Sequence, residues 1–309
     1  MIDYEAYELE MDLRLRRRAK TLPRRRRAPK EAIVELAQPG DSPVGFNPTF
    51  KAAHQDHHEY QWIVHALGGF YADSLINDVL RAVKGGKEAS VYCCEAHPAM
   101  GVKLLAAKIY RPRIFRNLKN DALYREGREL LDEEGKGIRD TRRQRALKKK
   151  TRYGSELAIT SWIEHEYQTL CLLYAAGADI PRPYAQQSNA ILMEYVGEAQ
   201  SPAPTLNLVS LERDEAWTLL ERVMRNVELM LAQNRIHADL SAYNILYWKG
   251  EIKLIDFPQA VDPRVNPSAA RLLARDVERV CQYFSRFGAR ADATHLAADL
   301  WSRYMRAEL

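Results

Sequence analysis

The sequence predicts an α+β molecule of two lobes, with strands concentrated before about residue 197 and helices after it. Short apolar runs bounded by Gly and Pro dominate the first part, and apolar residues at helical spacing dominate the second. The chain has 309 residues, of which 46% are hydrophobic and 28% charged, so it can bury a sizeable core. It contains no run of about eighteen apolar residues, which excludes a helix that spans a membrane.

The strand-rich part contains one glycine turn and two compact apolar runs. Residues 83–92 (VKGGKEASVY) predict a strand, a turn and a second strand. Residues 104–110 (LLAAKIY) and 190–196 (AILMEYV) are short and flanked by breakers, which is typical of buried strands. We expect ordered structure to begin near Trp62, with a short helix over residues 75–80.

The helix-rich part is preceded by one helix and contains one predicted hairpin. Residues 162–176 have apolar side chains at helical spacing and end at Gly177, a good helix stop. Residues 214–234 predict a second helix, and residues 267–309 are helical in pattern. Between them, residues 244–255 hold two short strands around a Lys-Gly turn, which predicts a β-hairpin.

Positively charged residues are concentrated in two segments of the chain, although the net charge is only +5. Residues 14–30 hold ten Lys or Arg and no acid, and residues 111–155 hold fifteen against seven acids. Blocks of like charge repel themselves and bury little, so we expect residues 1–55 to be a disordered basic arm. Both basic segments suit contact with RNA or a ribosomal particle, and a solvated tail without a partner is the alternative.

The cysteines and the amino terminus indicate a cytoplasmic protein. The four cysteines, two of them adjacent (Cys93 and Cys94), form neither a disulfide framework nor a zinc spacing. The first eighteen residues hold no apolar segment followed by a small-residue cleavage site, so we do not expect secretion.

The strongest chemical signal is the phrase from His237 to Asn244, followed twelve residues later by Asp256. Asp239 and Asn244 are five positions apart on a predicted loop, and Asp256 ends a predicted strand. Taken singly, Asp239 and Asn244 would be turn caps and Asp256 would be an aspartate at the end of a strand. Together they match the D-x-x-x-x-N then D pattern of phosphoryl-transfer sites. Their oxygens suit Mg²⁺, which takes few protein ligands and completes its shell with water and phosphate.

Such a site also needs a lysine on a strand and a helical glutamate. Lys108 lies inside the predicted strand 104–110, where a buried ammonium is costly without a partner. Glu166 lies on the predicted helix 162–176 and is the candidate partner. A lysine that extends to solvent along the surface is the alternative. The glycine turn at residues 85–90 is neither a G-x-G-x-x-G loop nor a P-loop, although its amides suit a triphosphate.

Five phrases of the sequence carry a further signal. They are GKEASVY (86–92), AKIY (107–110), WIEHEY (162–167), HADLSAYNILY (237–247) and ID (255–256). These phrases resemble the RIO atypical protein kinases, closest to the RIO1 branch, and the resemblance covers roughly residues 75–288. The DLS-x-YN-x-LY phrase is the specific part.

The resemblance implies a bilobal protein-kinase-like fold, trimmed to a RIO domain, over residues 60–309. Its N-lobe, an antiparallel sheet plus a helix, would span about 60–196 and include a flexible insert at 111–155. The C-lobe, mostly helical, would span about 197–309. The resemblance also implies a serine/threonine protein kinase that uses ATP with Mg²⁺ or Mn²⁺ and that autophosphorylates. Its main activity would be ATP hydrolysis or phosphorylation of a partner associated with the ribosome or with RNA.

Carried over position by position, the resemblance assigns roles to individual residues. Asp239 would be the catalytic aspartate. Lys108 would hold the α and β phosphates, and Glu166 would orient it. Asn244 and Asp256 would bind magnesium. The residues contacting the nucleotide would be Lys87, Ser90, Val91, Lys108, Met193, Glu194 and Val196. The candidate phospho-acceptors would be Asp256, Thr141, Thr151 and Ser155.

The sequence departs from ordinary kinases in three ways. Asp256 is followed by Phe257 and Pro258 instead of Phe-Gly, Ala238 replaces the arginine that reads activation-loop phosphate, and no A-P-E is present. These departures argue against control by activation-loop phosphorylation and against broad peptide-kinase activity. Asp276, on a helix that also resembles the family, would brace the catalytic loop.

Two other functions remain open from the sequence alone. A small-molecule phosphotransferase of the aminoglycoside-kinase type also uses H-x-D-x-x-x-x-N followed by Asp. An RNA- or ribosome-binding factor that uses ATP as a conformational switch would explain the basic segments.

Overall fold

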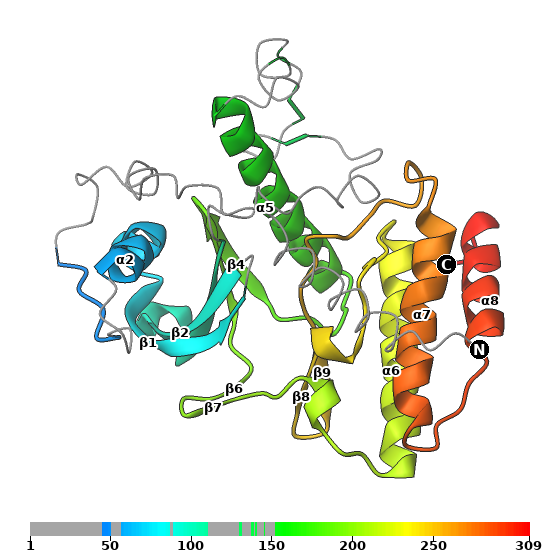
Figure 1. Cartoon of the computed structure of the whole chain (residues 1–309). Coiled ribbons are helices and arrows are strands. Elements are labelled where there is room, and N and C mark those ends of the chain that lie inside the picture. Colours follow the sequence, from blue (N-terminus) through cyan, green and yellow to red (C-terminus); the bar gives the residue numbers. More distant parts are fainter. Residues whose placement is uncertain are drawn as a thin grey trace, which may run out of the picture. The chain divides into compact units, whose positions relative to one another are not determined.

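The computed structural model describes residues 45–50, 57–86, 89–110, 130–131, 137–138, 140, 145 and 152–309. Within residues 41–309, which form one compact unit, a strand-rich N-lobe precedes a helix-rich C-lobe (Figure 1). The predicted α+β class is therefore confirmed.

The N-lobe is built on one antiparallel sheet. Its strands are β1 (Ile76–Gly85), β2 (Ala89–Ala96), β3 (Leu104–Tyr110), β4 (Pro183–Gln187) and β5 (Ala190–Glu194). They are ordered β1-β2-β3-β5-β4, so β3 lies at the centre and its residues pair on both sides. The register places Lys108 opposite Val91 of β2 and Ile191 of β5. The central strand thus fixes where the lysine lies.

Two helices pack against this sheet. Helix α2 (His57–Ala72) presents Ile63, Leu67 and Phe70, each at most 1% exposed, to a core shared with β1, β2, β3 and β5. Helix α5 (Arg152–Ala175) contacts β4 and β5. A 3₁₀ turn, η2 (Pro98–Met100), joins β2 to β3.

The C-lobe is a helical layer beside a small hairpin. Its elements are η5 (Leu206–Leu208), α6 (Arg213–Ala232), η6 (Ala242–Asn244), β8 (Ile245–Trp248), β9 (Glu251–Leu254), α7 (Ala269–Ser285) and α8 (Ala293–Met305). Helix α7 packs against both α6 and α8 (Figure 1). The predicted hairpin over residues 244–255 is confirmed, with its turn at Lys249 and Gly250.

Three local predictions differ from the structure. The short helix expected over residues 75–80 is wrong, because Ile76 begins β1. Register shifts in β1, between Ile76 and Asp78 and between Val79 and Arg81, put the buried residues Ile76 and Val79 three apart, which imitates helical spacing. The helix expected at 162–176 begins earlier, at Arg152, and order begins before Trp62.

A short hairpin connects the two lobes and depends on one glycine. Strands β6 (Gly197–Glu198) and β7 (Ser201–Pro202) pair directly after β5. Gly197 has φ +128°, and a Cβ there would lie 2.6 Å from the carbonyl oxygen of Ser201 and 2.7 Å from the amide nitrogen of Ala203. The tight hairpin therefore needs a residue without a side chain.

Replacing Gly197 by alanine is expected to lower the free energy of unfolding by about 2 kcal/mol, because both the dihedral and the space are unfavourable. Gly250→Ala is the matched control, since Gly250 has φ +83° but nothing within 4 Å of an added Cβ. Urea denaturation of both variants separates the two causes. Equal losses would show that the contacts at Gly197 do not matter.

Candidate active site

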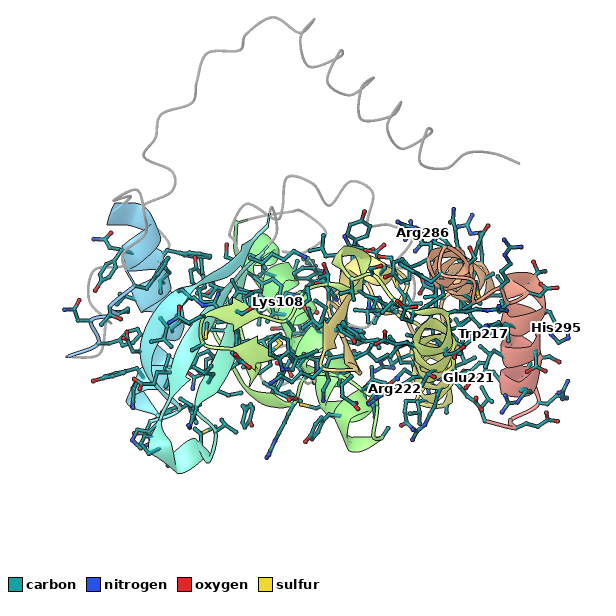
Figure 2. The ribbon with its side chains drawn as sticks, turned by 90° about the horizontal axis from the view of Figure 1, so that it is seen from below. Lys108, Trp217, Glu221, Arg222, Arg286 and His295 are labelled. Carbon is teal, nitrogen blue, oxygen red and sulfur yellow. The ribbon has the colours of Figure 1, made fainter. Side chains whose placement is uncertain are left out.

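Lys108 is held between two carboxylates from distant parts of the chain. It extends from β3 toward α5 (Figure 2), where its Nζ lies 2.8 Å from Oε1 of Glu166. The same Nζ lies 2.7 Å from Oδ1 of Asp256, just after β9. The side chains of Lys108 and Glu166 are 12% and 1% exposed. Lys108 is therefore a buried, paired lysine and not one that extends to solvent.

The charges in this cluster stabilise one another. Burial acts to lower the pKa of Lys108, but Asp256 and Glu166 outweigh it and hold that pKa well above its ordinary value. Burial acts to raise the pKa of Asp256, but the ammonium of Lys108 outweighs it and the pKa is lowered. At neutral pH the lysine is thus positive and the aspartate negative, as a phosphate and metal site requires.

Glu166 has further donors that fix its orientation. The hydroxyl of Tyr110 donates to Oε2, and the backbone N–H of Phe257 donates to Oε1 at 3.3 Å. Burial, followed by the charge of Glu166, raises the pKa of Tyr110 well above its ordinary value, so the phenol stays protonated and remains a donor. Tyr110 lies two residues after Lys108, so the two side chains share a face of β3.

The loop before Asp239 is clamped by α7. Asp276 accepts the N–H of Ala238 at 2.7 Å and the N–H of Leu240 at 3.2 Å, and Arg275 donates to the carbonyl oxygen of Ala238. Ala238 has φ +64°, which a non-glycine residue adopts only when its surroundings impose it. Asp276 therefore braces the loop that carries Asp239.

The loop of residues 237–244 and the segment that leads to Asp256 are joined by hydrogen bonds to backbone oxygens. The side-chain amide of Asn244 donates to the carbonyl oxygen of Asp239 at 2.9 Å, and the N–H of Ile255 donates to the carbonyl oxygen of Asn244 at 2.9 Å. His237, whose pKa burial lowers, donates from Nε2 to the carbonyl oxygen of Ile255 at 3.1 Å. Asp256 itself has φ +74°. The structure thus brings Asp239, Asn244 and Asp256 together.

The donor set in this cluster fits magnesium. Because Nδ2 of Asn244 is used by Asp239, its Oδ1 is the atom left as a ligand. Asp256 bonds Lys108 through Oδ1, which leaves Oδ2. Among the described residues, no three His, Cys, Asp or Glu side chains gather into a metal site. Two oxygens suit a cation that keeps several waters and phosphate oxygens.

The predicted nucleotide contacts lie along the sheet and the connection that follows it. Ser90, 2% exposed, and Val91 lie on β2, next to Lys108 in the register. Met193 and Glu194 end β5, and Val196 precedes the β6–β7 hairpin, accepting the N–H of Ala203 at 3.0 Å. Lys87 lies outside the described residues.

The connection after β5 is also held from β1. Nε of Arg81 donates to the carbonyl oxygen of Ala199 at 2.6 Å, and its guanidinium donates to the hydroxyl of Tyr195. The hydroxyl of Tyr195 donates in turn to the carbonyl oxygen of Glu198 at 3.1 Å. Tyr195 and its neighbours are therefore fixed against the N-lobe.

Several predicted residues lie beyond what the structure describes. Thr141, Thr151 and the basic segment 14–30 are outside the described residues, as is most of segment 111–155. Ser155 lies in α5, but its side chain is not described. Of the candidate phospho-acceptors, Asp256 alone is placed with its side chain.

Three site residues were not predicted from the sequence. Tyr110 and Arg275 contact the predicted residues directly, and Arg279 places Nη1 3.0 Å from Oδ1 of Asp239. Sequence spacing could have indicated two of them. Tyr110 is two residues from Lys108 on a strand, and Arg279 is three residues from Asp276 on a helix, so each shares a face with a predicted residue.

Asp276 is expected to make stability depend on pH. Burial, opposed by Arg275 and the two backbone amides, raises the pKa of Asp276 to about 7, against about 4 in an unfolded chain. Between these values the folded protein keeps a proton that the unfolded chain releases, so the stability due to Asp276 falls as pH rises.

The stability of the wild type relative to Asp276→Asn should therefore fall by about 1 kcal/mol per pH unit from pH 4 to pH 7. Urea denaturation across this pH range measures the difference in the free energy of unfolding between the two proteins. All other titrating groups are the same in both, so their contributions cancel in this difference. A constant or rising difference would contradict the buried, protonated carboxyl.

Comparison with known proteins identifies the same family over much of the chain. A family model described as RIO1, RIO domain, matches residues 122–296. The chain is similar to the RIO-type serine/threonine-protein kinase Rio1 of Haloferax volcanii, at 34% identity over 139 residues, which cover 45% of this chain and 47% of that protein. It is similar to serine/threonine-protein kinase RIO1 of Homo sapiens at 30% identity over 213 residues, covering 69% of this chain and 34% of that protein. The chain thus spans less than half the length of these two relatives.

Among solved structures, the chain is similar to the Rio2 kinase-ADP/Mg²⁺-phosphoaspartate complex from Chaetomium thermophilum. The TM-score is 0.51 and the identity 21%, over 81% of this chain and 70% of that chain. The likeness confirms the predicted bilobal kinase-like fold. No helix in the described ranges has the length and apolarity that a bilayer span requires.

Proposed function

Because the chain belongs to the RIO domain family, we propose that it is a serine/threonine protein kinase that uses ATP with Mg²⁺ and phosphorylates itself. The observation that carries this proposal is the position of Lys108, bonded to both Glu166 and Asp256 beside the loop of Asp239 and Asn244. A buried lysine between two carboxylates is the arrangement that holds a triphosphate and its counter-ion.

Each residue has a distinct task in this proposal. Lys108 binds the α and β phosphates, and Glu166 keeps its ammonium in place. Oδ1 of Asn244 and Oδ2 of Asp256 hold Mg²⁺, or Mn²⁺ in its place, which neutralises phosphate charge when bound. Asp239 accepts the proton of the acceptor hydroxyl. Catalysis then comes from positioning and charge neutralisation.

The nucleotide lies against the sheet in this proposal. Met193, Glu194 and Val196 bind adenine through their backbone, and the bonds from Arg81 keep that segment in place. Ser90 and Val91 cover the phosphates from β2, and Lys87 is a further candidate contact of the nucleotide. Asp256 is also a candidate acceptor of phosphate, since its carboxylate adjoins the metal position. Thr141, Thr151 and Ser155 are the candidate hydroxyl acceptors.

The proposed partner follows from charge, and the proposed location follows from four cysteines without a disulfide framework. We infer that the basic segments 14–30 and 111–155 contact RNA or a ribosomal particle in the cytoplasm, because each carries a large positive excess. The main turnover is ATP hydrolysis or transfer to such a partner.

Incubation of the purified chain with γ-labelled ATP and Mg²⁺ tests the proposed function. The expected result is label on the protein itself, which EDTA abolishes, followed by mass spectrometry of the labelled residue. A small-molecule phosphotransferase would consume ATP only when an acceptor is added, and a switch would bind ATP without labelling. Either of these outcomes would overturn the proposal of self-phosphorylation.

A further inference from the structure

Arg279 on α7 is bonded to the carboxylate that the proposed function uses as its base. Nη1 of Arg279 lies 3.0 Å from Oδ1 of Asp239. The proposed function gives Asp239 a proton to accept but gives Arg279 no task. An arginine at this place changes the charge that an incoming acceptor meets.

Two other charged residues of α7, Asp276 and Arg275, are bonded to the backbone beside Asp239. Asp276 accepts the N–H groups of Ala238 and Leu240, and Arg275 is bonded to the carbonyl oxygen of Ala238. Within the described part of the chain, Asp239 is the one carboxylate that forms an ion pair with Arg279. The arginine therefore pairs with the proposed base and, among the described residues, with no carboxylate of its own helix.

Both partners of this pair are accessible. The side chains of Arg279 and Asp239 are 34% and 44% exposed. A carboxylate has two oxygens, so a bond from Arg279 to Oδ1 leaves Oδ2 of Asp239 for an acceptor hydroxyl. A guanidinium has five N–H donors, so Arg279 can bind a second carboxylate while it holds Asp239.

We propose that Arg279 is a specificity-determining residue that binds an acidic side chain next to the acceptor hydroxyl. This inference rests on the proposed function, since it places the acceptor at Asp239. Consecutive Cα atoms are about 3.8 Å apart, so a hydroxyl and a flanking carboxylate can reach Asp239 and Arg279 together. The acceptor that fits is an acidic segment of protein, and a flanking Lys or Arg is repelled by the same guanidinium.

Arg279 takes no part in the bond changes. In the transfer, the acceptor oxygen forms a bond to the γ-phosphorus of ATP, the bond from that phosphorus to the β–γ bridging oxygen breaks, and the hydroxyl proton goes to Asp239. The arginine selects which acceptor binds at the site before the transfer. Its effect should therefore appear as a preference among acceptors.

Three peptides of equal length test the proposal, each with one serine flanked on both sides by Glu, Gln or Lys. The kcat/KM for label transfer from ATP is measured with the wild type, Arg279→Lys, Arg279→Gln and Arg271→Gln. Arg271 is exposed on the same helix and bonds Ser268, so it is the matched control. Thermal unfolding of every variant shows that it is folded.

The wild type should favour the Glu peptide over the Lys peptide by roughly tenfold, with the Gln peptide between them. Arg271→Gln should keep this ratio, Arg279→Lys should keep most of it, and Arg279→Gln should bring it close to one. A wild-type ratio near one, or a ratio that survives Arg279→Gln, would overturn the proposal.

The outcomes separate this inference from the proposed function. ATP consumption without transfer to any of the three peptides would overturn the role of Arg279 and leave the ATP chemistry standing. A wild type that neither labels itself nor consumes ATP would overturn the proposed function, and this inference would fall with it.

Discussion

Replacing Asp239 by asparagine is expected to lower phosphoryl transfer by about 10³-fold while ATP still binds. The amide keeps the size of the side chain but cannot accept the hydroxyl proton, and general-base catalysis contributes about 10²- to 10⁴-fold. ATP binding persists because Lys108, Asn244 and Asp256 are unchanged, and the side chain of Asp239 is 44% exposed. Self-labelling and calorimetric titration with ATP measure the two properties.

The control for this variant is Asp214→Asn. Asp214 is exposed in the first turn of α6 and undergoes the same chemical change away from the site. It should label itself at the wild-type rate. If Asp239→Asn turns over as fast as the control, Asp239 is not the catalytic aspartate.

Replacing Lys108 by methionine is expected to lower both stability and ATP turnover. Glu166, 1% exposed, would lose its cation, and breaking a buried pair on one side costs about 3 kcal/mol. The donors Tyr110 and Phe257 keep the loss at the lower end of the usual range. Turnover should fall by about 10²- to 10³-fold, because one preorganised phosphate contact is removed.

A double-mutant cycle separates the two effects of Lys108. Lys108→Met with Glu166→Gln leaves no buried charge without a partner, so it should be less destabilised than the sum of the single variants while turnover stays low. Lys249→Met is the control, since Lys249 pairs with Glu198 on the surface and should cost less than about 1 kcal/mol. Urea denaturation and ATP turnover are the measurements. Additive losses in the cycle would contradict the burial argument.

The sequence predicted the parts of the site whose geometry is local. Asp239 and Asn244 are five residues apart on one loop, and the hairpin that follows returns the chain to Asp256. Lys108 and Glu166 are 58 positions apart, and their pairing was expected because a phosphoryl-transfer site needs a lysine on a strand and a glutamate on a helix, not from spacing. Local pattern therefore identifies the residues of a motif, and the requirements of the reaction indicate which motifs meet.

Other features depend on tertiary contacts that no local pattern contains. The start of β1 was predicted as helix because its register shifts disturb the period of two. Arg279 looked like any polar residue on an amphipathic helix until the packing of α7 brought it to Asp239. Ala238 and Asp256 both have positive φ, which aspartate tolerates but alanine adopts only where its surroundings impose it.

The β6–β7 hairpin has one attachment on each side, and the two respond differently to salt. Toward the N-lobe, Arg81 bonds the carbonyl oxygen of Ala199 and the hydroxyl of Tyr195. Toward the C-lobe, Lys249 and Glu198 form an ion pair at 3.1 Å whose side chains are 69% and 65% exposed. Dissolved ions screen the exposed pair much more than the hydrogen bonds. As ionic strength rises, the pair between Lys249 and Glu198 should therefore weaken while the bonds from Arg81 persist, so the side-chain bonds that hold the hairpin at high salt are those to the sheet.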